Sequence, residues 1–387
     1  MILYYLVLFS VALLSTWWIF KKILKIALLK NIVDNPDARK IQKVPIPVLG
    51  GIAVFFGIIV SLTFTGLFYE TRTLFTIVGL MTIMLYVGTM DDILSLSPLK
   101  RFVIEIIVVL LLVFCNGYSL DNFHGLWNIY SIPHWASVLL TVFACVGIIN
   151  AINLIDGVNG LSSGYCITAC TLFGGVFIWA DDREAASLAV LCVGALIPFF
   201  CHNVFGKKSK MFIGDGGTLL MGTVMSVFVV CALNNESEIA AKVAPNFGLI
   251  PFTLAVLAIP VFDTLRVMSA RIARGTSPFH PDKTHLHHLL FDLHFSHIGT
   301  TVTEILANLF VVGTWYLCFQ LGASIDLQLY IVIVLGLLIT FGFYRFARVH
   351  QRKQTKVFYW LSRVGDWTHV GHTIWFERIR DELDKGC

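Results

Sequence analysis

Charged residues are scarce in this chain of 387 residues. Asp, Glu, Lys and Arg together make up 13% of it, whereas 57% of the residues are hydrophobic. The surface of a soluble domain carries charge on about a quarter or more of its residues. The mean hydropathy of +0.80 therefore excludes an ordinary soluble protein and indicates one that crosses a membrane several times. The nine cysteines include no C-x-x-C pair, so they give no sign of a zinc or redox motif.

Apolar runs long enough for a membrane span recur along the whole chain. A helix needs about 20 apolar residues to cross a hydrocarbon core of about 30 Å. Continuous runs favour helices over a barrel, whose strands would alternate in polarity. The sequence predicts an all-α polytopic membrane protein with about eleven transmembrane helices. They are expected near residues 2–20, 46–68, 73–90, 102–115, 134–152, 161–180, 185–205, 217–233, 247–268, 303–321 and 329–344.

Basic residues lie almost entirely in alternate connections between these runs. No Lys or Arg precedes the first run, which indicates a retained anchor with its N-terminus outside. The predicted outer loops hold only three basic residues, Arg72, Arg183 and Lys242. The alternate loops 21–45, 91–101, 206–216 and 271–300 hold seven, two, three and three, and nine more follow residue 344. This bias places the C-terminus and these loops in the cytosol.

We therefore expect one transmembrane catalytic domain, residues 1–344, and a cytosolic tail, residues 345–387. Carboxylates beside membrane spans are costly, so their retention at several span ends indicates function. The tail is rich in basic and aromatic side chains and is expected to lie along an anionic inner leaflet. The catalytic domain should carry its chemistry on the cytosolic loops 21–45, 91–101, 150–160, 206–216 and 271–300.

Asp215 is the leading candidate for a metal ligand. Oxygen ligands suit Mg²⁺, which is usually held by one or two carboxylates together with a substrate's phosphates. Gly214, Gly216 and Gly217 flank Asp215. Such glycines would let backbone and phosphate approach closely and would supply amide groups where a helix begins. A plain helix cap is the alternative.

Two further acidic groups lie at predicted cytosolic span ends. Asn153 and Asp156 are three residues apart and share a helical face, so Asn153 could serve a metal or phosphate and Asp156 a metal or sugar hydroxyl. Asp91 and Asp92 could orient or deprotonate an attacking group. A phosphate monoester has a second pKa of about 6 and needs only a weak base. Either pair could instead cap a helix.

A histidine cluster follows the ninth run. His280, His285, His287 and His288 could bind zinc, hydrogen-bond a diphosphate or line a polar loop. Arginines bind phosphate oxygens in a bidentate manner. Together with histidines and carboxylate-bound Mg²⁺, they would indicate a diphosphate-binding site. Three of them lie upstream in helical register, Arg266, Arg271 and Arg274.

From about Lys40 to His288, these motifs resemble in order and topology the polyprenyl-phosphate N-acetylhexosamine-1-phosphate transferases. That membrane family includes the phospho-MurNAc-pentapeptide translocase and the initiating enzymes of O-antigen, enterobacterial common antigen and teichoic acid synthesis. The resemblance implies catalytic roles near the lipid phosphate and metal for Asp91, Asp92 and Asp156. It implies that Asp215 and Asn153 contact Mg²⁺, with Mn²⁺ as an alternative. It implies substrate contacts for Lys43, Asn153, Asn159, Phe212, Arg271, His285, His287 and His288.

Within these contacts, the resemblance implies that Phe212 stacks on uracil and that Asn159 reads its edge. Many bacterial members have Asp at the position of Asn159. An amide both donates and accepts hydrogen bonds, so nucleotide recognition is retained, but a metal ligand or base is not favoured there. The stretch from Arg271 to His288 is similar to the GlcNAc-1-phosphate branch of the family rather than the translocase.

The reaction that the resemblance implies is transfer of N-acetylhexosamine 1-phosphate from a UDP-sugar to undecaprenyl phosphate, with release of UMP. GlcNAc-1-phosphate is the expected group. The site would lie on the cytosolic face of a bacterial inner membrane, and the product would initiate a cell-surface polysaccharide such as O-antigen or teichoic acid. No nucleic-acid partner is expected, and a homodimer is left open.

Two prolines in the ninth run, Pro251 and Pro260, could bend its helix and open a groove for the lipid tail. Asp263 and Arg266 would lie at the inner end of that groove. A transporter is one alternative, although its charges would lie near the midplane and its halves would show repeats. Another Mg²⁺-dependent membrane phosphotransferase, using CDP-alcohol donors, would need a compact Asp-rich motif that the sequence lacks. The sequence leaves open the donor sugar and the choice between direct displacement and a covalent intermediate.

Overall fold

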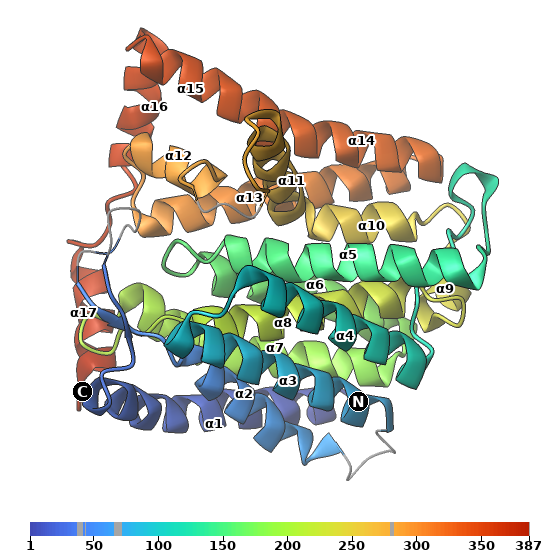
Figure 1. Ribbon diagram of the computed structural model, residues 1–387, viewed down its shortest axis with the longest axis horizontal. Coiled ribbons are helices and arrows are strands. Elements are labelled where there is room, and N and C mark those ends of the chain that lie inside the picture. The colour runs from blue at the N-terminus through green and yellow to red at the C-terminus, as the bar shows by residue number, and fades with distance from the viewer. Residues whose placement is uncertain (37–41, 43, 66–71, 279–281, 387) are drawn as a thin grey trace.

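The computed structural model describes the chain except residues 37–41, 43, 66–71, 279–281 and 387. In the described part the chain is mostly helical with almost no sheet, which confirms the predicted fold class (Figure 1). The one sheet found there is a short antiparallel pair, β1 (Val33–Asp34) and β2 (Ile46–Pro47), with Val33 opposite Pro47. The transmembrane region contains α1 (Ile2–Leu29), α2 (Gly50–Leu62), α3 (Arg72–Leu94), α4 (Pro98–Asn116), α5 (His134–Leu154), α6 (Leu161–Ala180), α7 (Arg183–Phe205), α8 (Gly214–Leu233), α10 (Leu249–Val256), α11 (Ala258–Ala273), α13 (His297–Gln320) and α14 (Ile325–Leu337).

Shorter helices complete the fold. A π-helical turn, Leu338–Phe343, continues α14 into α15. A 3₁₀ turn, Leu126–Asn128, lies in the connection between α4 and α5. The others are α9 (Glu238–Lys242), α12 (Leu286–Asp292), α15 (Tyr344–Arg352), α16 (Lys356–Asp366) and α17 (Ile374–Asp384).

A helix lies at each of the eleven predicted spans, but not all of these helices are long and apolar enough to cross a membrane. Within the described residues, eight helices are long and apolar enough to cross a membrane, and the bent pair α10 and α11 would make nine. Helix α2 has only 13 residues, and α4 carries Lys100, Arg101 and Glu105 in its first turns. The count of eleven spans and the orientation of the termini therefore stay predictions.

Helix α8 is the central helix of the bundle. Every residue of α8 except Asp215 is buried. It packs against α3 and α5, and at Gly222 its backbone lies directly against Ile149 of α5. Small residues let membrane helices approach closely. The result is a tightly held scaffold that places Asp215 at the N-terminal end of α8.

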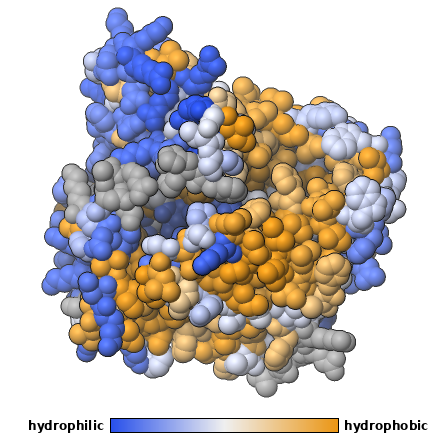
Figure 2. Space-filling view, in the orientation of Figure 1, coloured by the Kyte–Doolittle hydropathy of each residue, from blue (hydrophilic) through white to orange (hydrophobic). Residues whose placement is uncertain are grey.

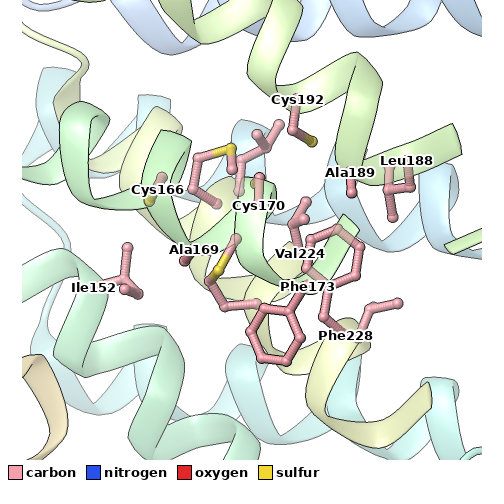
Figure 3. Close-up of a cluster of buried hydrophobic side chains, with 14 of the residues drawn as sticks. Ile152, Cys166, Ala169, Cys170, Phe173, Leu188, Ala189, Cys192, Val224 and Phe228 are labelled. Carbon is pink, nitrogen blue, oxygen red and sulfur yellow. The ribbon is translucent and has the colours of Figure 1, made fainter. Parts of the chain in front are cut away.

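An apolar core fills the space between α6, α7 and α8. Phe173 of α6 packs on Phe228 of α8, with ring centroids 5.6 Å apart (Figure 3). Cys166, Cys170 and Cys192 lie buried and unpaired in the same cluster. They act as small apolar side chains.

The predicted bend of the ninth span is present, and its cause can be assigned to one of the two prolines. Helices α10 and α11 meet at 75°. Pro260 has no N–H to donate to the carbonyl oxygen of Val256, one turn before it. Asn308 Nδ2 donates to that oxygen at 2.9 Å, and Tyr165 also bonds it. Pro251 instead lies in the first turn of α10, where proline is tolerated, so it does not make the bend.

The predicted cytosolic segments gather at one end of the molecule. In Figure 1 the ends of α3 and α5 and the start of α8 lie toward the same side as α12, α16 and α17. Figure 2 shows hydrophilic residues concentrated on that side and hydrophobic residues across the middle of the visible face. The polar motifs singled out in the sequence therefore share one end of the helical bundle.

Candidate active site

The end of α3 caps the start of α8. Asp92 Oδ1 accepts a hydrogen bond from the backbone N–H of Asp215 at 3.0 Å, and Oδ2 accepts one from Gly216 at 3.3 Å. A carboxylate in this position satisfies free amides of a helix N-terminus and complements the helix dipole. Asp92 thus holds the first turn of α8, the turn that carries Asp215.

The glycines around Asp215 serve packing rather than phosphate approach, which differs from the expectation. A Cβ at Gly214, whose φ is +71°, would meet the carbonyl oxygen of Val48 and the carboxylate of Asp92. Gly216 lies against Thr89 of α3, and Gly217 against α2. The amides of residues 215 and 216 are already bonded to Asp92. They are therefore not free to bind a phosphate.

Asn153 and Asp215 lie together, as the sequence predicted. Asn153 Nδ2 donates to Asp215 Oδ1 and to Thr218 Oγ1, each at 2.8 Å. Both amide hydrogens are used in this way, so the amide oxygen is the atom left for coordination. The side chain of Asp215 is 37% exposed and can be reached from outside. One carboxylate and one amide oxygen fit Mg²⁺ that also binds substrate phosphates.

Arg101 lies among three carboxylates and was not singled out from the sequence. Its Nη1 lies 3.1 Å from Asp91 Oδ2 and 3.7 Å from Asp215 Oδ2, and its Nε lies 3.5 Å from Glu105 Oε1. The buried Glu105 also accepts a hydrogen bond from Asn150 Nδ2 at 2.5 Å. Only the i, i+4 spacing of Arg101 and Glu105 could have signalled part of this network.

Asp156 lies at the end of α5, beside the Asp215 site. Burial, together with the negative charge of Asp215, raises the pKa of Asp156 to about 7, although Ser162 donates a hydrogen bond to it. A carboxyl group with a pKa near neutrality can exchange a proton at physiological pH. Asp156 is therefore suited to a protonation role or to binding a cation.

One of the predicted histidines meets the loop 150–160. His287 of α12 lies directly against Gly157, where a Cβ would be 2.6 Å from its Nε2. Burial and then the charge of neighbouring histidines lower the pKa of His287, and the same causes lower the pKa of His288 to about 4. Both rings are therefore neutral at pH 7 and can act as hydrogen-bonding groups rather than cations.

His285 is oriented by a buried carboxylate. Its Nδ1 lies 2.8 Å from Asp263 Oδ2, and Arg266 bonds Asp263 Oδ1 at 2.7 Å. Arg266 also lies over the ring of Tyr344, 3.7 Å from its centroid. Within the described structure, His285 Nε2 is buried and has no hydrogen-bond partner. A bound substrate or water could supply that partner.

Arg271 is engaged within its own loop. Its guanidinium bonds Asp282 at 3.0 and 3.3 Å and the carbonyl oxygen of Pro278 at 2.6 Å. Burial alone would raise the pKa of Asp282, but the hydrogen bonds and charge of Arg271 outweigh it and lower that pKa to about 2. These bonds fasten the loop, and substrate contact by Arg271 stays a prediction. Lys43 and His280 lie outside the described residues.

The expected nucleotide-binding residues lie on neighbouring loops. Asn159 donates its N–H to His297 Nδ1 at 3.2 Å, and its carbonyl oxygen accepts from Thr301. Asn203 accepts from Gly160 N–H at 2.6 Å and donates to the Met211 carbonyl oxygen at 2.8 Å. Asn203 thus ties the loop 150–160 to the segment that ends in Phe212.

The described residues contain no group of three or more His, Cys, Asp or Glu side chains arranged to hold a metal ion. A magnesium ion at Asp215 and Asn153 would need further oxygen atoms from substrate or water, as is usual for this ion.

The chain is similar to known 1-phosphate transferases. Residues 74–233 match the family described as glycosyl transferase family 4. The chain is 29% identical to the probable undecaprenyl-phosphate N-acetylglucosaminyl 1-phosphate transferase of Bacillus subtilis (strain 168), over 84% of this chain and 88% of that protein. It is 31% identical to the undecaprenyl-phosphate alpha-N-acetylglucosaminyl 1-phosphate transferase of Salmonella typhi, over 79% and 81%. The enzyme of the same name from Escherichia coli O157:H7 is 30% identical, over 75% and 77%.

Proposed function

Because the chain belongs to the family of undecaprenyl-phosphate N-acetylglucosaminyl 1-phosphate transferases, within glycosyl transferase family 4, we propose that it initiates a cell-surface polysaccharide. It is an enzyme that transfers a sugar 1-phosphate. The proposed donor is UDP-GlcNAc or a close UDP-N-acetylhexosamine, and the acceptor is undecaprenyl phosphate. The acidic site around Asp215, at the same end of the bundle as the histidine-rich loop, is the observation that carries this proposal.

The proposed reaction is a phosphoryl transfer. An oxygen of undecaprenyl phosphate attacks the β-phosphorus of the UDP-sugar, the phosphorus to which the sugar is attached through oxygen. The bond from that phosphorus to the bridging oxygen breaks, and UMP leaves with the electron pair. The lipid phosphate is largely a dianion at neutral pH, so the attack requires little help from a base.

Asp215 and Asn153 would hold Mg²⁺ together with diphosphate oxygens. Bound there, the ion supplies neutralisation of the diphosphate and of the departing UMP. Asp92 acts indirectly on the metal site, because it fixes the helix turn from which Asp215 projects. This gives Asp92 a positioning role, and we assign the contact with the acceptor phosphate to Asp91, which is paired with Arg101.

The remaining polar groups suit recognition of the diphosphate and sugar. Arg101 brings positive charge to Asp91 and Asp215, where two phosphate groups must approach each other. The neutral rings of His287 and His288 can hydrogen-bond donor oxygens without adding charge. The contact of His287 with Gly157 brings that ring beside Asp156.

An apolar cavity supports a lipid acceptor. A cavity of about 710 Å³ lies between α4, α5, α10 and α11, and its lining includes Phe102, Leu140, Leu257 and Leu265. Asn150 also lines it and bonds Glu105, which in turn contacts Arg101. An isoprenoid chain in this cavity would therefore have its phosphate directed toward the acidic site. The bend between α10 and α11 forms one wall.

Release of UMP by the purified protein tests this proposal. UDP-GlcNAc, UDP-GalNAc and their deoxy variants would each be supplied with undecaprenyl phosphate and Mg²⁺. We expect metal-dependent UMP release, fastest with UDP-GlcNAc. Absence of UMP with every donor would contradict the proposed reaction, and a different fastest donor would correct only the sugar.

A further inference from the structure

The last turn of the C-terminal tail is bonded to the loop that leads into α8. Asp384, the last residue of α17, accepts hydrogen bonds from the backbone N–H groups of Lys207 at 3.2 Å, Lys208 at 3.0 Å and Ser209 at 3.0 Å. The Ser209 hydroxyl donates to the same carboxylate at 2.8 Å. These residues begin the connection 206–213, which ends immediately before Gly214 and Asp215.

This arrangement is a strong anchor for a surface loop. Hydrogen bonds from amides to a carboxylate are charge-assisted and roughly twice as strong as neutral ones. Burial would raise the pKa of Asp384, but the amides of Lys208, Ser209 and Lys207 outweigh it and lower that pKa. The carboxylate is therefore ionised at neutral pH and keeps its three consecutive amide donors.

The tail itself is held in place on both sides of this contact. Phe376 of α17 packs on Phe205, the last residue of α7, with ring centroids 5.2 Å apart. Lys21 Nζ, in the C-terminal third of α1, donates to the carbonyl oxygen of Lys385. In Figure 1, α17 runs along the end of the molecule where the candidate site lies. Asp384 is thus fixed relative to α1 and α7.

A second part of the tail contacts another loop of the site. Ser296 donates its N–H to Thr368 Oγ1 at 2.9 Å and its hydroxyl to the Thr368 carbonyl oxygen at 2.6 Å. Ser296 precedes His297, whose Nδ1 accepts from Asn159. The tail therefore touches the start of α13 as well as the loop before α8.

The second half of the loop is fixed by the body of the protein. Phe212 donates its N–H to the Pro47 carbonyl oxygen at 2.7 Å, and its own carbonyl oxygen accepts from Gly50 at 2.9 Å. Asn203 holds Met211. The bonds to Asp384 therefore fix the first half of the same loop, three to five residues before Phe212.

We propose that Asp384 is a positioning residue for the transfer reaction, which acts through loop 206–213 on Phe212 and Asp215. The inference rests on the proposed function, since it assigns the loop to the donor nucleotide. Asp384 touches no reacting atom. It fixes the backbone of Lys207, Lys208 and Ser209 and so limits the movement of the segment that leads into Phe212 and Asp215.

The test uses full-length protein with three single substitutions. D384A removes the acceptor, and D384N keeps one amide oxygen that can accept from the loop. D381A is the matched control, because the side chain of Asp381 on the same helix is 74% exposed and lies 3.8 Å from Arg380. Hydrogen–deuterium exchange across 206–213 reports the anchor itself. The effect of losing this anchor on catalysis is measured by kcat and by the KM values for the UDP-sugar and for undecaprenyl phosphate. The melting temperature measures its effect on stability.

We expect D384A to speed amide exchange at 207–209 and to raise the KM for the UDP-sugar by about tenfold, the scale of losing hydrogen bonds to a charged group. The KM for the lipid acceptor and the melting temperature should change little, D384N should recover part of the effect, and D381A should match the unmodified protein. Unchanged exchange at 207–209 in D384A, or faster exchange with an unchanged donor KM, would overturn the inference.

Failure of the proposed function would be visible separately, because the unmodified protein would then release no UMP with any donor. In that case hydrogen–deuterium exchange still tests whether Asp384 positions the loop. Faster exchange that extends in D384A from Ser209 through Phe212 to Asp215 supports the positioning role. Exchange that changes only at 207–209, with Phe212 and Asp215 as protected as before, contradicts it. If D384A does not fold, the same comparison is made with D384N.

Discussion

Asp92 accepts the backbone N–H of Asp215 at 3.0 Å, so the carboxylate that ends α3 caps the helix that carries the candidate metal ligand. This bond gives the two carboxylates different tasks, although both belong to acidic motifs at the same end of the bundle. Asp215 presents its side chain outward, whereas the carboxylate of Asp92 accepts hydrogen bonds from the backbone of α8. The account predicts that the two respond differently to substitution.

Asp215→Asn should abolish transfer while leaving the fold intact. The substitution removes the charge that holds the metal but keeps the size of the side chain and an acceptor for Asn153. We expect kcat to fall by about 100-fold or more, since a metal-assisted step depends on its carboxylate ligand. Steady-state UMP release measures this. Asp181→Asn, in the exposed turn before α7, is the control and should retain full activity.

Asp92→Ala should lower stability as well as activity. Loss of a helix cap typically lowers the free energy of unfolding by about 1 kcal/mol. We expect a lower melting temperature in detergent for Asp92→Ala and a smaller decrease for Asp92→Asn, which keeps one acceptor oxygen. Equal melting temperatures for unmodified protein and Asp92→Ala would contradict the capping role.

Arg101→Ala should be destabilising because it leaves the buried Glu105 without its cation. Removing one partner of a buried ion pair destabilises the fold, and we expect a lower melting temperature for this variant. Adding Glu105→Gln should restore much of that stability, since glutamine is neutral and can still accept from Asn150. Activity should stay low in the double variant, because Asp91 and Asp215 still lack Arg101. Thermal unfolding and UMP release separate the two effects.

Asp156 should make the stability of metal-free protein depend on pH. Its pKa is raised from 3.8 to about 7, chiefly by burial, so the folded state favours the protonated carboxyl group. The folded protein binds more protons than the unfolded chain between these two values. The contribution of Asp156 to stability is therefore fully present below about pH 4 and is lost as pH rises toward 7.

Melting temperatures measured in EDTA across this range check the sign. Asp156→Asn cannot titrate, so the unmodified protein should lose stability relative to this variant as pH rises from about 4 to 7. A difference between the two proteins that stays constant with pH would rule out the raised pKa. Asp381→Asn, an exposed carboxylate on α17, should follow the unmodified protein.

Much of this arrangement is visible in the sequence, because it depends on local patterns. Continuous apolar runs mark the helices, and their ends carry the polar motifs, so Asn153 and Asp215 could be expected to meet. The clustering of basic residues in alternate loops placed these motifs on one face. Such signals need no knowledge of how the helices pack.

The rest depends on packing between distant segments. Arg101 meets Asp215 only because α3 and α4 both lie beside the start of α8, and nothing local to either residue reports that. The glycines beside Asp215 looked suited to phosphate, but neighbouring helices occupy the space they leave. Asp384 and Ser209 are 175 residues apart in the chain, so their bond could not be inferred from spacing. The bend after Val256 needs Asn308 as well as Pro260.

The fate of the β-phosphorus tests the central claim most directly. Purified protein would be given UDP-GlcNAc labelled with ³²P at the β-phosphorus, undecaprenyl phosphate and Mg²⁺. The account predicts that the label passes to the organic phase as undecaprenyl-diphosphate sugar, with unlabelled UMP in the aqueous phase, and that EDTA or Asp215→Asn stops the transfer. Label that remains in the aqueous phase, or transfer that persists without divalent metal and with Asp215→Asn, would contradict it.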